Sequence, residues 1–220
     1  MAMQARALAT VSLDDKYALD KGRVFMTGTQ ALVRLPMLQR QRDLAAGLNT
    51  GGFISGYRGS PLGAYDQALW QARKFLKNGN IHFQPGVNEE LGATAVWGSQ
   101  QVNLWGGAKV DGVFGIWYGK GPGVDRSIDA IKHANFAGTS RHGGVLAFAG
   151  DDHACKSSTL PHQSDHAFMH AFMPVINPAG VQEFLDLGLI GWALSRYAGT
   201  WVGFTTVADT IDTTAIVTID

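Results

Sequence analysis

The sequence predicts an α/β protein with three layers, in which a mainly parallel sheet carries helices on both faces. Short apolar runs alternate along the chain with segments whose apolar residues recur every three to four positions, the pattern of strands followed by helices. A content of 28 glycines in 220 residues, with 45% hydrophobic residues, is typical of a compact core with many tight turns. We expect an extended lead-in over residues 1–22 and one domain over residues 23–220.

The first predicted elements are a helix, a strand and a second helix. Leucines spaced three to four residues apart indicate a helix over residues 28–49, with an interruption at Pro36. The short apolar run over residues 51–57 is followed by turn residues, as a buried parallel strand is. The next helix, over residues 61–76, begins with Pro61 in its first turn, where proline is favourable.

The middle of the chain continues the alternation. A weak strand over residues 81–83 precedes a helix over residues 88–104, for which Asn88 is the expected N-cap. A strand over residues 113–118 then leads into a glycine-rich loop, Gly119–Asp125.

The remaining elements complete the sheet and its helices. The loop leads into a helix over residues 126–136, and a strong strand over residues 144–149 precedes a polar, histidine-rich segment over residues 151–170. The last predicted elements are a short strand, an amphipathic helix and a final strand, over residues 174–176, 181–197 and 200–207. Ligands bind beyond the carboxyl ends of such strands, so the segments that follow them are expected to converge on one edge.

Composition excludes several classes of partner. Eighteen basic and eighteen acidic residues give no formal net charge, and no basic run indicates a nucleic-acid partner. The single cysteine, Cys155, excludes an internal disulfide and is typical of a reducing compartment. Residues 1–21 lack an apolar core of signal-peptide length, and no apolar run is long enough to span a membrane. We therefore expect a cytoplasmic protein.

Two acids open the helix predicted over residues 88–104. A helix dipole stabilises carboxylates at this position, which is the simplest explanation for Glu89 and Glu90. However, Gly92 and Ala93 follow, and such small residues let a helix approach another backbone or a flat ligand closely. We therefore expect Glu89 to point into a dry environment at the ligand-binding edge.

Four segments resemble the thiamine-diphosphate-dependent 2-oxoacid:ferredoxin oxidoreductases. They are Tyr57–Gly63, Asn88–Ala95, Gly119–Gly123 and Gly150–Asp152, in this order and spacing. The similarity extends from about Lys21 nearly to the end of the chain. Within the family, it is to the N-terminal part of the indolepyruvate enzymes, the pyrimidine domain of the thiamine-diphosphate-binding fold, which holds the aminopyrimidine ring of the cofactor.

The resemblance implies roles for individual residues. Glu89 would be catalytic, since its hydrogen bond to a pyrimidine ring nitrogen helps the cofactor lose the proton of its thiazolium carbon. Arg58 and Ser60 would bind the carboxylate of the substrate. Together with Glu89, the residues implied to bind the cofactor are Gly56, Tyr57, Gly92, Lys120, Gly121 and Pro122.

The implied reaction is the oxidative decarboxylation of a 2-oxoacid, indolepyruvate or another aryl pyruvate, to an acyl-coenzyme A. Electrons would pass to ferredoxin. The chain lacks cysteine clusters for iron–sulfur centres, and the match of Gly150–Asp152 to a diphosphate-binding motif is interpreted as accidental. Mg²⁺, the diphosphate and the 4Fe-4S clusters would thus be bound outside this chain, by the rest of the polypeptide or a partner subunit. A homo-oligomer is expected.

Two alternatives remain open at this point. His153, His162, His166 and His170 are spaced in part like ligands on one helix face, which would suit a metal-dependent hydrolase. Pro161, within this segment, favours a loop over such a helix. The other alternative is a ligand-binding module without catalysis.

Overall fold

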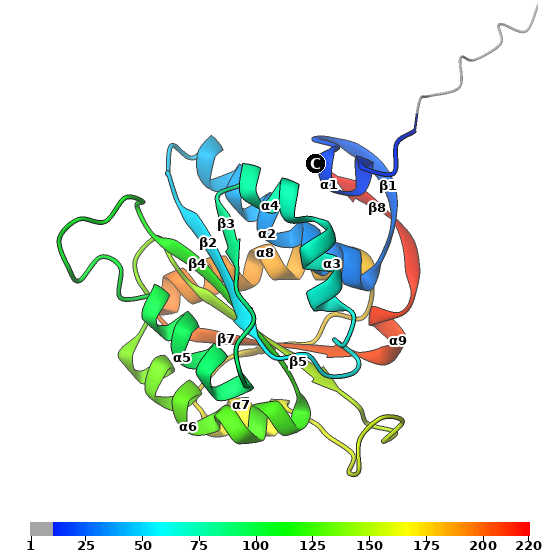
Figure 1. The fold of residues 1–220 in the computed structure, drawn as a ribbon, viewed down its shortest axis with the longest axis vertical. Coiled ribbons are helices and arrows are strands. Elements are labelled where there is room, and N and C mark those ends of the chain that lie inside the picture. Colours follow the sequence, from blue (N-terminus) through cyan, green and yellow to red (C-terminus); the bar gives the residue numbers. More distant parts are fainter. Residues whose placement is uncertain (1–10) are drawn as a thin grey trace, which may run out of the picture.

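The computed structural model describes residues 11–220 and has three layers (Figure 1). Its six-stranded sheet is parallel throughout, in the order β3-β2-β4-β5-β7-β6. The strands are β2 (Gly51–Gly56), β3 (Ile81–Phe83), β4 (Val113–Lys120), β5 (Val145–Asp151), β6 (Val175–Ile176) and β7 (Trp201–Val207). The predicted fold class, a mainly parallel sheet covered on both faces, is confirmed.

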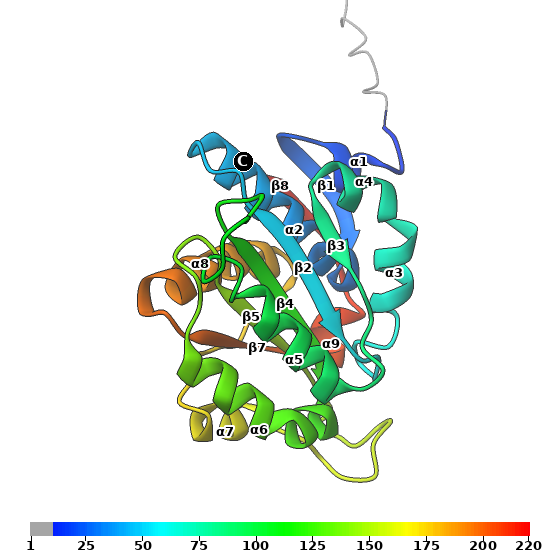
Figure 2. The ribbon, with the colours of Figure 1, turned by 60° about the vertical axis from the view of Figure 1, so that its left-hand side comes forward.

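Helices cover the two faces of the sheet unequally (Figures 1 and 2). One face carries α2 (Gly28–Ala45), α3 (Tyr65–Gln71), α4 (Arg73–Asn78) and α8 (Val181–Ala198). The other carries α5 (Glu89–Ser99), α6 (Gly121–Ala137) and α7 (Asp165–His170). Among residues 11–220, no helix has both the length and the apolar character needed to cross a membrane.

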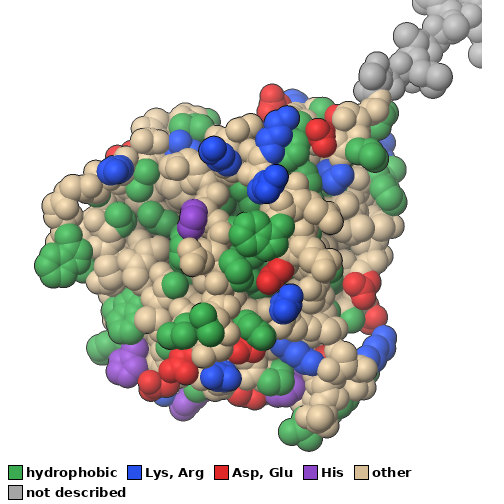
Figure 3. All heavy atoms as spheres, viewed as in Figure 1, with side chains coloured by type: hydrophobic (Ala, Val, Ile, Leu, Met, Phe, Trp, Pro, Cys, Tyr) green, Lys and Arg blue, Asp and Glu red, His purple; other side chains and the backbone are tan. Residues whose placement is uncertain are grey.

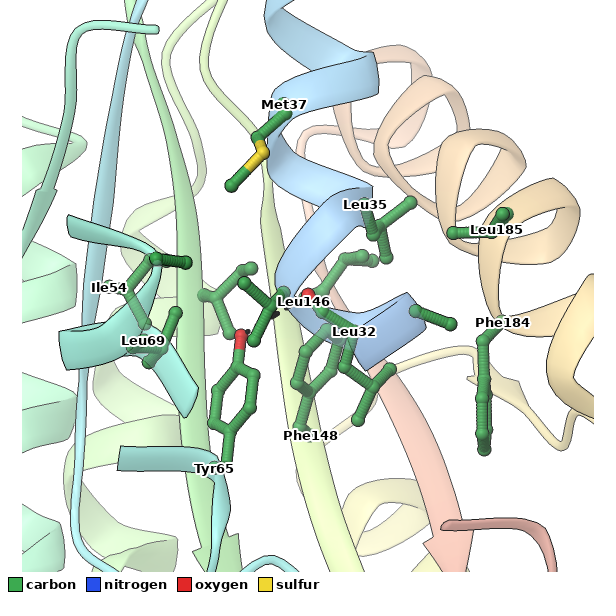
Figure 4. Close-up of a cluster of buried hydrophobic side chains, with 14 of the residues drawn as sticks. Leu32, Leu35, Met37, Ile54, Tyr65, Leu69, Leu146, Phe148, Phe184 and Leu185 are labelled. Carbon is green, nitrogen blue, oxygen red and sulfur yellow. Dashed lines mark hydrogen bonds between the residues drawn. The ribbon is translucent and has the colours of Figure 1, made fainter. Parts of the chain in front are cut away.

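A hydrophobic core fills each of the two interfaces between sheet and helices. On the α2 and α8 side, leucines of α2 meet aromatic and aliphatic side chains of β5 and α8 (Figure 4). On the opposite side, Trp117 and Trp201 lie fully buried under α5, α6 and α7. An ion pair also ties α8 to α2, because Arg196 donates to both carboxylate oxygens of Asp43, at 2.7 and 2.8 Å.

A second, small sheet was not predicted. Strand β1 (Gly22–Thr27) pairs antiparallel with β8 (Thr214–Ile219), so β7 is not the last strand of the chain. Helix α9 (Ala208–Ile211) connects β7 to β8. The expected extended lead-in is also wrong in part, since α1 (Asp15–Ala18) forms a helical turn there; residues 1–10 lie outside the described chain.

Several predicted boundaries also differ from the structure. Helix α2 continues through Pro36, and the helix predicted over 61–76 starts later and breaks at Ala72 between α3 and α4. The loop predicted over Gly119–Asp125 does not form. Strand β4 continues to Lys120 and α6 begins at once, with Pro122 in its first turn, where its missing N–H needs no partner.

Candidate functional site

The segments that follow the strands converge on one edge, as expected. A Cβ atom added to Gly92 would lie 2.8 Å from Cα of Gly56, so α5 approaches the end of β2 backbone to backbone. A Cβ at Gly59 would lie 2.7 Å from Cβ of Lys120, which joins the segment after β2 to the end of β4. One at Gly150 would lie 2.9 Å from Cδ of Pro61. This edge, where β2, β4 and β5 end, is the candidate site.

Helix α5 begins at the site and is held there by several contacts. The side chain of Asn88 caps it by accepting a hydrogen bond from the N–H of Leu91 at 2.8 Å, as predicted. The indole N–H of buried Trp117 donates to the carbonyl of Glu89 at 2.9 Å. The start of α5 is thus fixed both by its own cap and by the sheet.

The side chain of Glu89 lies across the first turn of α6. A Cβ at Gly123 would lie only 2.6 Å from Cγ of Glu89 and 3.0 Å from its Oε1, so glycine makes room for the acid. Glu89 is half-buried rather than enclosed in a dry environment, whereas Glu90 is exposed. Within residues 11–220, no hydrogen bond from another group reaches the Glu89 carboxylate, which leaves it available to a ligand.

The start of α6 forms the other wall of the site. Its first backbone N–H groups have no partner within the helix, as at every helix N-terminus. The ammonium group of Lys120 donates to the carbonyl of Ser157 at 2.5 Å, and the ring of His162 fills the space where a Cβ of Gly121 would lie. Pro122 is exposed. The loop after β5 therefore covers part of this helix start.

Two buried carboxylates hold that loop in place. Asp151 accepts hydrogen bonds from the backbone N–H and the hydroxyl of Ser164, at 2.9 and 2.5 Å, and burial raises its pKa. Asp152 accepts from the backbone N–H groups of Ser157 and Lys156, and these bonds lower its pKa. Both acids are engaged within the chain.

The residues after β2 lie at the surface of the site. The side chains of Tyr57, Arg58 and Ser60 are exposed, and Ser60 shares a cavity of about 400 Å³ with Asp152. The N–H of Tyr57 donates to the carbonyl of Tyr118 at 3.0 Å, which extends the pairing of β2 with β4.

Sequence reasoning missed a buried pair behind Arg58. Asp66, in the first turn of α3, and fully buried Tyr118 both have raised pKa values, chiefly because burial disfavours their charged forms. The charge of Arg58 favours ionised Asp66 and lowers its pKa in part. Asp66, five residues after Pro61 in the predicted helix, was a signal that sequence reasoning could have used. Its partner Tyr118 could not be found in this way, because the two residues lie on elements far apart in the sequence.

The side chains of the histidine-rich segment make separate contacts. Among residues 11–220, no three histidine, cysteine or acidic side chains gather where they could hold a metal ion. His162 instead lies 3.6 Å from Asp125, and His170 lies 3.1 Å from the ammonium group of Lys132. Among the described residues, the histidines of 153–170 therefore share no common set of ligands.

Comparison with known proteins gave related sequences and folds but no matching family model. The indolepyruvate oxidoreductase subunit IorA of Methanothermobacter marburgensis is 24% identical over 178 residues, which cover 80% of this chain and 25% of that protein. A 2-oxoglutarate:ferredoxin oxidoreductase from Magnetococcus marinus, solved with 2-oxoglutarate, coenzyme A and succinyl-CoA bound, has the same fold. Its TM-score is 0.60 at 14% identity, over 89% of this chain and 31% of that one.

The chain is therefore similar in sequence to an indolepyruvate oxidoreductase subunit and in fold to a 2-oxoglutarate:ferredoxin oxidoreductase. The chain spans about a quarter of the length of the indolepyruvate oxidoreductase subunit.

Proposed function

We propose that this chain supplies the aminopyrimidine-binding half of a thiamine diphosphate site in a 2-oxoacid:ferredoxin oxidoreductase. The enzyme would decarboxylate indolepyruvate or another aryl pyruvate oxidatively, form an acyl-coenzyme A and pass the electrons to ferredoxin. The name of the curated relative supports indolepyruvate, and the ligands of the Magnetococcus enzyme support a 2-oxoacid and coenzyme A.

The observation that carries this proposal is the position of Glu89. Its carboxylate lies at the ligand-binding edge of the sheet, in room that Gly123 makes for it. It accepts no hydrogen bond from residues 11–220. A carboxyl group placed in this way can hold a proton on one oxygen and share it with a ring nitrogen.

The residues around Glu89 fit a flat heterocycle. When bound, thiamine diphosphate supplies the electron sink that decarboxylation of a 2-oxoacid needs. Gly56 and Gly92 act by bringing α5 against β2, which positions Glu89. The exposed parts of Tyr57, Lys120 and Pro122, with the backbone of Gly121, would line the ring. Mg²⁺, the diphosphate and 4Fe-4S clusters would be held outside this chain.

Arg58 and Ser60 are proposed to bind the substrate carboxylate. Arginine binds carboxylates through paired hydrogen bonds, and both side chains are exposed at the edge where β2 ends. Asp66 lies behind Arg58 and interacts with its charge, so it can orient the guanidinium group.

The test replaces Glu89 by glutamine in the full-length enzyme. The variant keeps the size of the side chain but loses the acid, so we expect the 2-oxoacid-dependent reduction of ferredoxin to slow by about 10²–10⁴-fold while thiamine diphosphate still binds. Glu90→Gln is the matched control, because Glu90 is exposed, and its rate should change little. Equal rates for the two variants would reject the role of Glu89 and favour a ligand-binding module without catalysis.

A further inference from the structure

Strand β3 forms an open edge of the six-stranded sheet, because β2 is its only neighbour among the described strands. Backbone groups of alternate residues bond to β2. The carbonyl of Asn80 accepts from the N–H of Gly52 at 3.0 Å, and the N–H of Gln84 donates to Ile54 at 3.0 Å. Since backbone groups alternate sides along a parallel strand, those of Ile81 and Phe83 face away from β2. This outer row is available to pair with another strand.

A large cavity adjoins this edge. It measures about 1030 Å³ and lies where α3 and α4 meet β3. Its apolar part includes Trp70, whose side chain is 49% exposed, and Phe83, whose ring centroid lies 4.9 Å from that of Trp70. An apolar side chain from a partner can therefore be buried beside the strand edge.

The cavity is strongly basic, although the whole chain has equal numbers of acidic and basic residues. Arg73, Lys74 and Lys77 of α4 contribute to its lining, and no aspartate or glutamate does. All three cations are exposed. Figure 3 shows basic side chains above an apolar patch on this face, and an acidic side chain beside a basic one below it. The cations project from α4 and not from β3, so they leave the backbone of the strand edge open.

We propose that the outer edge of β3 docks an extended acidic segment of a partner protein, which adds a strand to the sheet. Backbone hydrogen bonds to Ile81 and Phe83 would fix the register of that segment, as in other strand-addition complexes. Its carboxylates would meet the cations of α4, and an apolar side chain would pack on Trp70. An edge strand readily pairs with a further strand unless charged side chains repel that strand. Here the cations of α4 favour a strand that carries acidic side chains.

The probe is a short fluorescent peptide in which every second residue is, in turn, glutamate, valine and glutamate, with threonine between them, so that all three side chains lie on the face of the added strand toward α3 and α4. It is titrated against the full-length protein by anisotropy. We expect saturable binding that weakens as salt is added. The variant Lys74→Gln with Lys77→Gln should bind about tenfold more weakly, the effect of losing two exposed ion pairs. Arg126→Gln removes an exposed cation of α6, on the opposite face of the sheet, and should bind as the unchanged protein does.

Two further peptides test the mode of binding. A peptide N-methylated at every residue cannot complete the backbone pairing in any register, and one with lysine in place of glutamate carries the wrong charge; neither should bind. Equal binding of the N-methylated peptide would overturn strand addition, and equal binding of the lysine peptide would overturn the charge selection. If the glutamate peptide does not bind, the proposal is overturned. Binding of ATP would then indicate that the basic cavity takes a polyphosphate, and self-association in sedimentation would indicate that the edge of β3 pairs with a second copy of the chain.

Discussion

Replacing Gly123 by alanine should impair catalysis without impairing folding. The new Cβ would lie 2.6 Å from Cγ of Glu89 and 3.1 Å from its Cδ. Carbon atoms in favourable contact are about 3.5–4.0 Å apart, so the Glu89 side chain has to move by roughly 1 Å. Because Glu89 is half-buried, it can rotate away from α6 toward solvent.

The expected loss of rate follows from this displacement. A misplacement of about 1 Å in a reacting group can cost ~10²-fold in rate, so we expect Gly123→Ala to slow the 2-oxoacid-dependent reduction of ferredoxin by about that factor. Stability should not fall, since alanine in place of a helical glycine stabilises by up to about 1 kcal/mol. Turnover is measured on the full-length enzyme and stability by denaturant unfolding of the same preparation.

Gly98→Ala is the matched control for this experiment. Gly98 is also helical, but it is exposed whereas Gly123 is buried, and a Cβ at Gly98 meets nothing within 4 Å. The control should gain stability and keep its rate. If Gly123→Ala kept its rate as well, Gly123 would not set the position of Glu89. A large loss of stability in denaturant unfolding would also refute the prediction, because the substitution would then act on the fold and not on Glu89 alone.

Three further substitutions test contacts inside the fold. Gly92→Ala would bring its Cβ within 2.9 Å of the backbone nitrogen of Gly56, which cannot move freely, so denaturant unfolding should show a loss of about 1–3 kcal/mol. Asp43→Asn leaves the partly buried guanidinium of Arg196 without its carboxylate, and a loss of about 3–5 kcal/mol is expected; a loss below 1 kcal/mol would contradict a structural role for the pair. Burial raises the pKa of Asp151, so the folded state binds its proton more tightly and gains stability as the pH falls through that pKa. Asp151→Asn should make the free energy of unfolding depend less on pH in this range. If its pH dependence stayed unchanged, Asp151 would not be the group responsible.

The alternation of strands and helices was readable because it is local. Each apolar run or three-to-four-residue repeat records which face of one element is buried, and the order of these elements implies a parallel sheet. The pairing of β1 with β8 was not readable in this way. It joins the two ends of the described chain, and neither segment signals its partner by itself.

The start of α6 shows a different limit. Gly119, Gly121 and Gly123 together indicate a loop, since glycine is a turn residue. In the structure each serves a close contact instead: Gly119 makes room for the ring of Trp117, Gly121 for His162 and Gly123 for Glu89. Two of these contacts, those with His162 and Glu89, come from other segments of the chain, so composition alone suggested a loop where the fold requires small side chains.

The same contacts explain why the position of Glu89 at this edge could be predicted and its surroundings could not. Asn88 and the small residues of α5 mark a helix start that approaches another backbone, and this signal lies within a few residues. The half-buried state of the acid depends on Gly123, which the sequence connects to it only through the fold. If Glu89 acts as proposed, water must be excluded from a carboxyl group that this chain covers only in part. A second protein surface therefore has to cover α5 and α6. The proposed catalytic role of Glu89 requires that surface, so evidence against either one is evidence against the other.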